Sequence, residues 1–224
     1  MSNQEKKKGA LPCGLWLRLG PDLALEELMR DLKQIYFVIN QSAYEKNMHT
    51  LELVIDETNH DEKGKAGLLF AQARDNGIAT ILRGSAQCAH DIEADGVLLD
   101  KVDDVKDAKD ILGEDAIIGV ACGTSDEKAA AAYDAGVDFV SFGTASSAMP
   151  DPSVLKFWTM LSDLPAVIEG DVNNDYAAYY VQQGAAFLDC KEYIWTHQKG
   201  LMQGVVNMLH AIEIALEDDK KALQ

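Results

Sequence analysis

The sequence predicts a single α/β domain built as a (β/α)8 barrel, and three observations support this. Residues 116–143, AIIGVACGTSDEKAAAAYDAGVDFVSFG, have the pattern of strand, helix and strand, and their first apolar run is continuous, as in a strand buried on both faces. Strand-like and helix-like segments alternate along most of the chain. The length of 224 residues suits one compact domain. Such alternation predicts a parallel sheet, closed or doubly wound, and eight countable strands favour the closed TIM barrel.

Eight segments have the apolar, β-branched composition of buried parallel strands. They are residues 36–39, 51–55, 78–82, 96–99, 117–121, 139–142, 166–169 and 186–189. The stretch GLWLRL at 14–19 precedes all of them. We interpret it as a short extra strand or as part of an N-terminal cover.

The helices are predicted from apolar spacing and end signals. An N-terminal helix is expected over residues 22–33, because its leucines recur at near-helical intervals. The helix inside residues 116–143 has Thr124 or Ser125 as its cap and stops at Gly136. Further helices are expected at 63–74, 104–112 and 173–183, and a final helix over 199–216 closes the barrel.

The chain shows no internal domain boundary. Residues 1–10 are expected to be a disordered tail, 11–216 the barrel domain, and 217–224 a frayed acidic tail. The start, MSNQEKKKGA, lacks the apolar core of a signal peptide, and no apolar run reaches the length of a membrane span. A cytoplasmic location is therefore expected.

Charge and cysteine usage restrict the function classes. A formal net charge of −17 argues against nucleic acid and against anionic membrane surfaces as partners, because phosphate groups are bound by basic patches. The cysteines have no metal-binding spacing and are expected to be free thiols. They are Cys13, Cys88, Cys122 and Cys190.

Several segments share their order and spacing with one family. GIATIL, HDIEADGVLLDKVDD, the 116–143 unit, DPSVLKFWTML, LPAVIEGDVN and GAAFLDCKEYIW together resemble the thiamine phosphate synthase family, most nearly its alphaproteobacterial branch, over about residues 22–216. The resemblance implies a barrel that condenses hydroxymethylpyrimidine pyrophosphate with thiazole phosphate, giving thiamine phosphate and pyrophosphate. It also implies Mg2+ as cofactor and a small-molecule site at the C-terminal mouth of the strands.

The resemblance assigns roles to residues after the second, third and fourth expected strands. Where the family has basic residues after the second strand, this chain has Asp56 and Glu57. Arg83 and Gly84 stand at the family's Asn-Asp positions, whose acid binds Mg2+, and Arg83 is a candidate to hold an anion instead. Asp103 falls on the second metal-binding acid, and it equally suits the cap of the next helix.

The later strand ends also differ from the family pattern. Cys122 stands near the place of a Ser or Thr beside the pyrimidine, and the family's lysine-ended lid is shortened to TASSAMP. The Gly-Gly pair that admits the thiazole phosphate becomes Glu169 and Gly170. Lys191 and Glu192 replace small residues after the eighth strand. We hypothesise that Lys191 pairs with Glu169 or Glu192 and plugs the phosphate pocket.

Three interpretations follow from these substitutions. The first is an active thiamine phosphate synthase, which the match in fold supports. The replaced residues oppose it, since each lost charged contact removes on the order of 2 to 4 kcal/mol of transition-state stabilisation and the ordinary activity should be severely reduced. The second is a non-catalytic barrel that binds a cationic or neutral small molecule, or a protein partner. The third is a different enzyme on the same scaffold. The sequence leaves open whether the chain forms a homo-oligomer.

The first interpretation assigns the site residues in three groups. They are Arg83 and Lys191 for catalysis, Asp56, Cys122, Glu169, Gly170 and Glu192 for substrate binding, and Asp103 for the metal.

Overall fold

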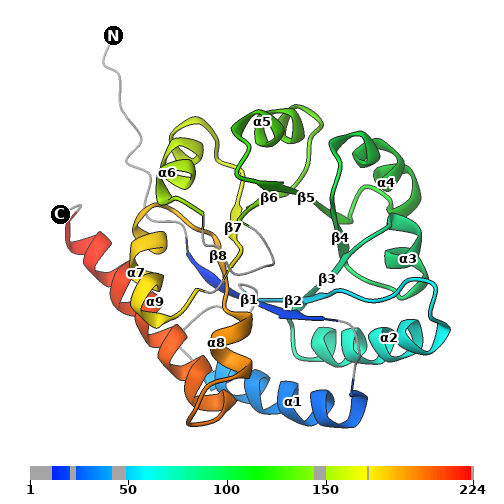
Figure 1. Ribbon diagram of the computed structural model, residues 1–224, viewed down its shortest axis with the longest axis horizontal. Helices are drawn as coiled ribbons and strands as arrows, with labels where there is room; N and C mark the ends of the chain where they lie inside the picture. The colour runs from blue at the N-terminus through cyan, green and yellow to red at the C-terminus, as the bar shows by residue number, and fades with distance from the viewer. Residues whose placement is uncertain (1–11, 21–23, 42–48, 144–149, 171, 223–224) are drawn as a thin grey trace.

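The computed structural model is a closed barrel of eight parallel strands surrounded by helices (Figure 1). It describes residues 12–20, 24–41, 49–143, 150–170 and 172–222. The strands are hydrogen-bonded in chain order, and β8 pairs with β1 to close the sheet. They are β1 Gly14–Leu19, β2 Thr50–Leu53, β3 Ala79–Arg83, β4 Gly96–Leu99, β5 Ile117–Gly123, β6 Phe139–Phe142, β7 Ala166–Ile168 and β8 Phe187–Asp189. The predicted (β/α)8 fold is confirmed.

Helices follow the strands and cover the outside of the barrel (Figure 1). They are α1 Leu25–Gln41, α2 His60–Asp75, α3 Ala86–Asp91, the short η2 Val102–Asp104, α4 Val105–Leu112, α5 Asp126–Asp134, α6 Pro152–Leu161, α7 Asn174–Gln182, α8 Lys191–Trp195 and α9 Leu201–Ala222. Ser125 is the cap of α5, since its side chain accepts a hydrogen bond from the Lys128 N–H. No helix within the described ranges is both long and apolar enough to cross a membrane.

The predicted first strand is wrong, because residues 36–39 belong to α1. The buried side chains of this helix are Leu32, Ile35, Tyr36 and Ile39. They are three or four residues apart, or adjacent, and so lie on one face of the helix, which includes two residues of the apolar run. Phe37, inside the same run, is 62% exposed. The apolar composition of residues 36–39 suggested a strand, but the spacing of the buried residues around them is that of a helix.

The real first strand is the stretch GLWLRL, which the sequence left as an extra strand or a cover. All six of its residues are buried, and it pairs with both β2 and β8. The expected N-terminal helix is therefore α1, which follows the first strand instead of preceding the barrel.

The ends of the chain differ in part from expectation. The last helix, α9, continues to Ala222, beyond its predicted end at residue 216. The expected tail at residues 1–10 and the last two residues of the chain lie outside the described ranges.

The barrel interior and the layer under the helices are two separate apolar regions. The interior cluster contains Trp16, Ile81, Leu98, Phe139 and Val167. The Trp16 ring lies 5.3 Å from that of Phe139, centroid to centroid. A Cβ at Gly119 would lie 2.2 Å from the Phe139 ring, so a glycine there leaves room for the aromatic side chain. These residues fill the middle of the barrel and form the floor of any site above them.

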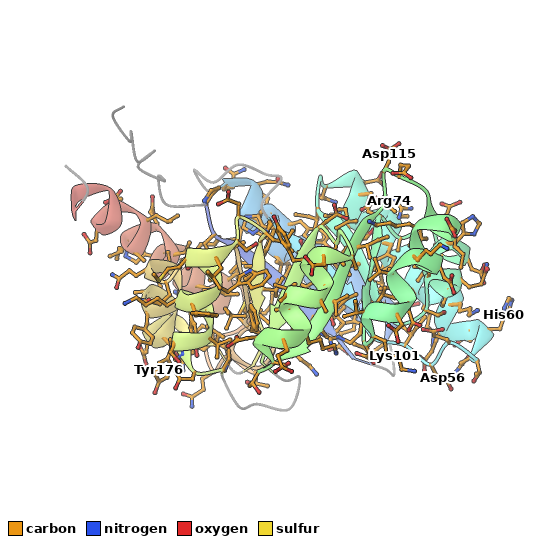
Figure 2. The ribbon with its side chains drawn as sticks, turned by 90° about the horizontal axis from the view of Figure 1, so that it is seen from above. Asp56, His60, Arg74, Lys101, Asp115 and Tyr176 are labelled. Atoms are coloured by element: carbon orange, nitrogen blue, oxygen red, sulfur yellow. The ribbon has the colours of Figure 1, made fainter. Side chains whose placement is uncertain are left out.

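The two ends of the barrel are distinguished in Figure 2. Asp56 and Lys101 follow β2 and β4, and they lie at the same end of the molecule as Tyr176, near the start of α7. Arg74 and Asp115 precede β3 and β5 and lie at the opposite end. The former end is the C-terminal mouth of the strands, where barrel enzymes carry their active sites.

Candidate functional site

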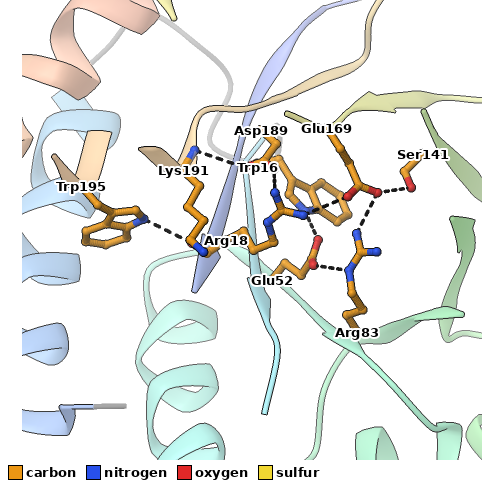
Figure 3. Close-up of polar contacts among 9 residues, drawn as sticks. All are labelled: Trp16, Arg18, Glu52, Arg83, Ser141, Glu169, Asp189, Lys191 and Trp195. Atoms are coloured by element: carbon orange, nitrogen blue, oxygen red, sulfur yellow. Dashed lines mark hydrogen bonds and ion pairs between the residues drawn. The ribbon is translucent and has the colours of Figure 1, made fainter. Parts of the chain in front are cut away.

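Charged side chains occupy the barrel interior at the C-terminal end of the strands (Figure 3). Four of them are almost completely buried, and only the side chain of Arg83 reaches solvent, with an exposed fraction of 16%. We term these five residues the charged cluster: Arg18, Glu52, Arg83, Glu169 and Asp189.

Strand register and alternation bring the charged cluster together. Arg18 on β1 lies opposite Glu52 on β2. Arg18, Arg83 and Glu169 each come two residues after a member of the interior apolar cluster, so their side chains point into the barrel one layer above it. Asp189 occupies the equivalent place on β8, two residues after Phe187, whose side chain packs on that cluster.

Ion pairs connect all five members of the cluster. Arg83 is held from both sides: its Nε lies 2.7 Å from Oε1 of Glu52, and its Nη2 lies 2.7 Å from Oε1 of Glu169. Arg18 places Nη1 at 2.9 Å from Oε2 of Glu169 and contacts Oδ2 of Asp189 through Nη2. Glu169 therefore bridges the two guanidinium groups.

Each of the three carboxylates also accepts a hydrogen bond from an uncharged N–H or O–H group. The indole N–H of Trp16 donates to Glu52, and the hydroxyl of Ser141 donates to Glu169. The backbone N–H of Lys191, at the start of α8, donates to Oδ1 of Asp189 over 3.1 Å. Buried carboxylates are costly without such partners, and these contacts offset part of that cost.

The electrostatic balance of the charged cluster is negative. Three carboxylates and two guanidinium groups give a net charge of −1 when every group is ionised. Burial raises the pKa of Asp189 to about 7, although Arg18 opposes the rise. Burial acts to lower the pKa of Arg83. The negative charges and hydrogen bonds of Glu52 and Glu169 have the larger effect, so the pKa of Arg83 is raised overall. Near neutral pH the net charge of the cluster therefore lies between −1 and zero.

The two residues assigned to catalysis lie in different surroundings. Arg83 belongs to the charged cluster, and its guanidinium is occupied by Glu52 and Glu169. Lys191 begins α8, and its Nζ lies 3.7 Å from where a Cβ at Gly20 would be. Among the described side chains Glu169 pairs with the two arginines, and no ion pair with Lys191 is seen. Only the backbone of Glu192 is described, so its pairing lies outside the described atoms.

The remaining residues assigned to substrate binding are dispersed. Asp56 is exposed in the loop before α2, where its carboxylate accepts hydrogen bonds from the Thr58 hydroxyl and N–H, and these lower its pKa. Cys122 lies in the apolar layer under the helices, and burial raises the pKa of its thiol to about 12. Gly170 follows Glu169 with a φ of 134°, a conformation that favours glycine.

The described residues do not fit the magnesium ion that the resemblance implies. Asp103 is exposed on η2, and the described ranges contain no group of three His, Cys, Asp or Glu side chains placed to hold a metal. A Cβ at Gly84 would lie 1.9 Å from Oε1 of Glu57, so an acid there has no room unless Glu57 moves. Asp103 does not serve as a cap either, because η2 and α4 begin without a side-chain cap.

Glu57 has a structural role in place of the expected pyrophosphate contact. Its carboxylate accepts hydrogen bonds from the backbone N–H and the hydroxyl of Ser85, over 2.6 and 2.5 Å. Ser85 is in turn the cap of α3. The acid therefore links the loop after β2 to the start of α3.

Sequence reasoning missed four residues of this site: Arg18, Glu52, Ser141 and Asp189. Arg18, Glu52 and Ser141 each have a polar side chain inside a strand whose other residues are buried, as in the segments GLWLRL and TLEL. Asp189 ends β8 as a buried acid after the buried Leu188. That combination was the available signal, since charged residues are seldom buried unless they are paired. Arg18 could not be found while GLWLRL was treated as an extra strand.

Comparisons with known proteins agree with this architecture. The sequence model of the thiamine monophosphate synthase family matches residues 36–188. The thiamine-phosphate synthase of Hyphomonas neptunium is 34% identical over 155 residues, which cover 66% of this chain and 69% of that protein. That of Rhodospirillum centenum is 33% identical over 139 residues, covering 58% and 66%. These matches span about two thirds of each relative's length.

Solved structures show the same fold at lower identity. Thiamine phosphate pyrophosphorylase from Pyrococcus furiosus superposes with a TM-score of 0.70 at 18% identity, covering 93% of this chain and 98% of that one. The closed parallel barrel with polar groups at its C-terminal mouth defines the class of (β/α)8 barrel proteins. Within that class, the chain belongs to the thiamine monophosphate synthase family and is a thiamine phosphate synthase-like protein.

Proposed function

We propose that this chain is a thiamine phosphate synthase-like barrel that has lost the ordinary condensation and binds a cationic or neutral small molecule at its mouth. The observation that carries the proposal is the position of Arg83 between Glu52 and Glu169. The cationic group best placed to meet a departing pyrophosphate is already neutralised by internal carboxylates. A cytoplasmic location goes with this proposal, because the family belongs to thiamine biosynthesis.

Charge development explains why the condensation is disfavoured. Loss of pyrophosphate is accelerated by positive charge placed where the negative charge accumulates. Arg18 and Arg83 are the inward cations of the charged cluster, and three carboxylates oppose them. Releasing Arg83 to a substrate would leave Glu52 and Glu169 without that partner in a buried site, which costs several kcal/mol. Binding of an anion must exceed this cost before any chemistry begins.

The same charges favour a different ligand class. A cluster with a net charge between −1 and zero attracts a cation, and it does not repel a neutral heterocycle. An aminopyrimidine or thiamine itself has that character. Mg2+ is the family's cofactor, but the described acids do not form a site for it, so the proposal uses no step through a metal.

A second candidate function is the condensation itself, with Arg83 turned away from its carboxylates. It is favoured by the 34% identity to the thiamine-phosphate synthase of Hyphomonas neptunium. In that case Arg83 and Lys191 would hold the pyrophosphate.

Calorimetric titration together with a product assay separates the two candidates. The purified chain is titrated with pyrimidine pyrophosphate and with thiazole phosphate, each with and without Mg2+, and then with thiamine and an aminopyrimidine. The Hyphomonas neptunium synthase is carried through in parallel as the positive control. We expect binding of thiamine or the aminopyrimidine, no magnesium-dependent binding of either phosphate, and no thiamine phosphate. Magnesium-dependent turnover would overturn the proposal.

A variant tests the neutralisation directly. Glu169→Gln removes one negative charge while keeping the size of the side chain, and it should leave Arg18 and Arg83 partly available to anions. We expect this variant to bind inorganic pyrophosphate more tightly than the wild type, by about tenfold. Asp103→Asn removes the same charge from an exposed position and is the matched control. Equal pyrophosphate affinity of the two variants would contradict the assigned role of Glu169.

A further inference from the structure

A cavity of about 390 Å3 opens on the outside of the barrel, between the end of α8 and the first two turns of α9. These two helices lie side by side (Figure 1). We term it the α8–α9 cavity, and its described lining consists of seven residues between Tyr193 and Asn207. Its volume falls in the range of sites that bind small molecules.

The α8–α9 cavity is separate from the barrel mouth, because α8 lies between them. The indole N–H of Trp195 donates to the carbonyl of Arg18 on β1 over 3.2 Å, so this side of α8 faces the barrel. The hydroxyl of Tyr193 instead accepts a hydrogen bond from Asn207 on α9. Residues two apart lie about 200° from each other around a helix, so Tyr193 points away from the charged cluster.

Hydrogen bonds and ring packing hold the walls of the cavity in place. Nε2 of Gln203 donates to Oδ1 of Asn207 over 2.8 Å, and Nδ2 of Asn207 donates to the hydroxyl of Tyr193 over 3.0 Å. The rings of Tyr193 and His197 pack edge-on, with centroids 5.1 Å apart. The side chains that line the cavity are therefore already positioned for a ligand.

Two of these side chains have donors without an acceptor among the described residues. The Tyr193 hydroxyl accepts from Asn207, so its own proton is directed elsewhere. Nδ1 of His197 accepts the Lys199 N–H over 3.2 Å, so a neutral ring carries its proton on Nε2. That Nε2 lies 3.4 Å from Nδ2 of Asn207, which is itself a donor. Both groups thus border the same nitrogen and require an acceptor from outside the protein.

Charge selects the kind of acceptor. The described lining contains Lys199 and no Asp or Glu, although the chain has 37 acids against 20 bases. No ion pair to Lys199 is seen among the described side chains. An ammonium group beside two neutral donors suits an oxyanion, whose oxygens accept several hydrogen bonds at once. Most of the surface repels such a ligand, whereas this lining attracts it.

We propose that the α8–α9 cavity binds a small molecule bearing an oxyanion, as a phosphate ester or a carboxylate. The oxygens accept hydrogen bonds from Oη of Tyr193, Nε2 of His197 and Nζ of Lys199. The volume of the cavity leaves room for an organic portion beside the tyrosine ring. This proposal is independent of which ligand the barrel mouth binds.

NMR spectroscopy of the histidine rings tests the proposal on the full chain. Inorganic phosphate is added at constant pH, and sodium chloride at the same ionic strength serves as the reference. The Cε1–H resonance of His197 should shift and saturate, with a dissociation constant in the millimolar range. The ring of His210 is 69% exposed farther along α9, and its resonance should not move.

Variants locate the binding site. Lys199→Gln and Tyr193→Phe should each weaken phosphate binding by about fivefold, because each removes one donor and leaves the helices unchanged. Lys106→Gln removes the same charge from an exposed position on α4, and Tyr133→Phe removes a hydroxyl from an exposed ring on α5. Both of these matched controls should bind phosphate like the wild type.

Acetate, titrated in the same way, distinguishes the two sources of the oxyanion. Tighter binding of phosphate would identify a phosphate ester as the ligand class, and tighter binding of acetate a carboxylate. The proposal is overturned by any of three results. They are a His197 resonance that saturates with neither anion, shifts that sodium chloride reproduces, and a phosphate affinity that both cavity variants leave unchanged.

Discussion

The Nη2 atom of Arg83 lies 2.7 Å from Oε1 of Glu169, although the two residues come from opposite sides of the barrel sheet, on β3 and after β7. The other carboxylate oxygen of Glu169 contacts Arg18 on β1. A single acid thus crosses the barrel axis and joins three strands that do not neighbour one another in the sheet. The charged cluster therefore stabilises the closed sheet as well as occupying the candidate site.

Removing the bridging acid should destabilise the protein strongly. Glu169→Ala leaves two buried guanidinium groups short of a partner, and we expect a loss of about 3 to 5 kcal/mol in the free energy of unfolding. Glu27→Ala breaks an exposed pair with Arg30 and should cost less than about 1 kcal/mol. The free energy of unfolding of both variants is measured by urea titration and compared with that of the wild type. Equal losses for the two variants would mean that the charged cluster adds nothing beyond a surface pair.

The stability of the wild type should depend on pH through Asp189. Its folded pKa of about 7 lies above the ordinary value of 3.8, so between these pH values the folded protein binds one more proton than the unfolded chain. The contribution of this group to stability is complete below pH 3.8, decreases as pH rises, and is lost above about pH 7. Asp189→Asn cannot titrate, so its stability lacks this slope.

Comparison of the two proteins isolates the effect of Asp189. From pH 4 to pH 8, the free energy of unfolding of the wild type should fall by about 3 kcal/mol relative to that of Asp189→Asn. Urea titrations at four pH values across the range are sufficient. Parallel pH profiles would show that Asp189 is ionised in the fold at a normal pKa.

His49 should give a pH dependence of the opposite sign. His49 immediately precedes β2, and its Nδ1 accepts a hydrogen bond from the Leu15 N–H on β1 over 3.1 Å. Burial lowers its pKa from 6.5 to about 4. Its contribution to stability is therefore complete above pH 6.5 and is lost as pH falls toward 4. Relative to His49→Asn, the wild type should lose about 3 kcal/mol over that interval. His210→Asn changes an exposed histidine and should not alter the profile.

The barrel could be predicted because its evidence is local, whereas the charged cluster depends on the closure of the sheet. The unit at residues 116–143 contains two strands, a helix, a cap and a stop signal within one short segment, and the structure reproduces them. The pairing of Arg18 with Glu169 joins residues 151 positions apart, and only a closed barrel brings them together. Sequence alone also could not show that Arg83 is occupied, since its partners lie on β2 and after β7.

The misplaced first strand has a related cause. Tyr36 and its neighbours are apolar enough for a strand, and only the buried face shared with Leu32 and Ile35 identifies them as helical. Treating the run as a strand displaced GLWLRL from the barrel and hid Arg18. Mistaking one helical segment for a strand therefore prevented the prediction of Arg18 as a residue of the site.

Gly96 provides a test of the close packing between two paired strands, β4 and β5. A Cβ at Gly96 on β4 would lie 2.0 Å from the carbonyl oxygen of Ile117 on β5, so Gly96→Ala forces two paired strands apart. We expect it to cost about 1 to 3 kcal/mol or more, because a backbone atom cannot rotate away as a side chain can. Gly64→Ala is the matched control, since no atom lies within 4 Å of a Cβ at that position on α2. It should stabilise the protein by about 0.5 to 1 kcal/mol through helix propensity, and thermal unfolding should show melting temperatures shifted in opposite directions. If Gly96→Ala were tolerated as well as Gly64→Ala, β4 and β5 would have to be farther apart than their register and hydrogen bonds place them.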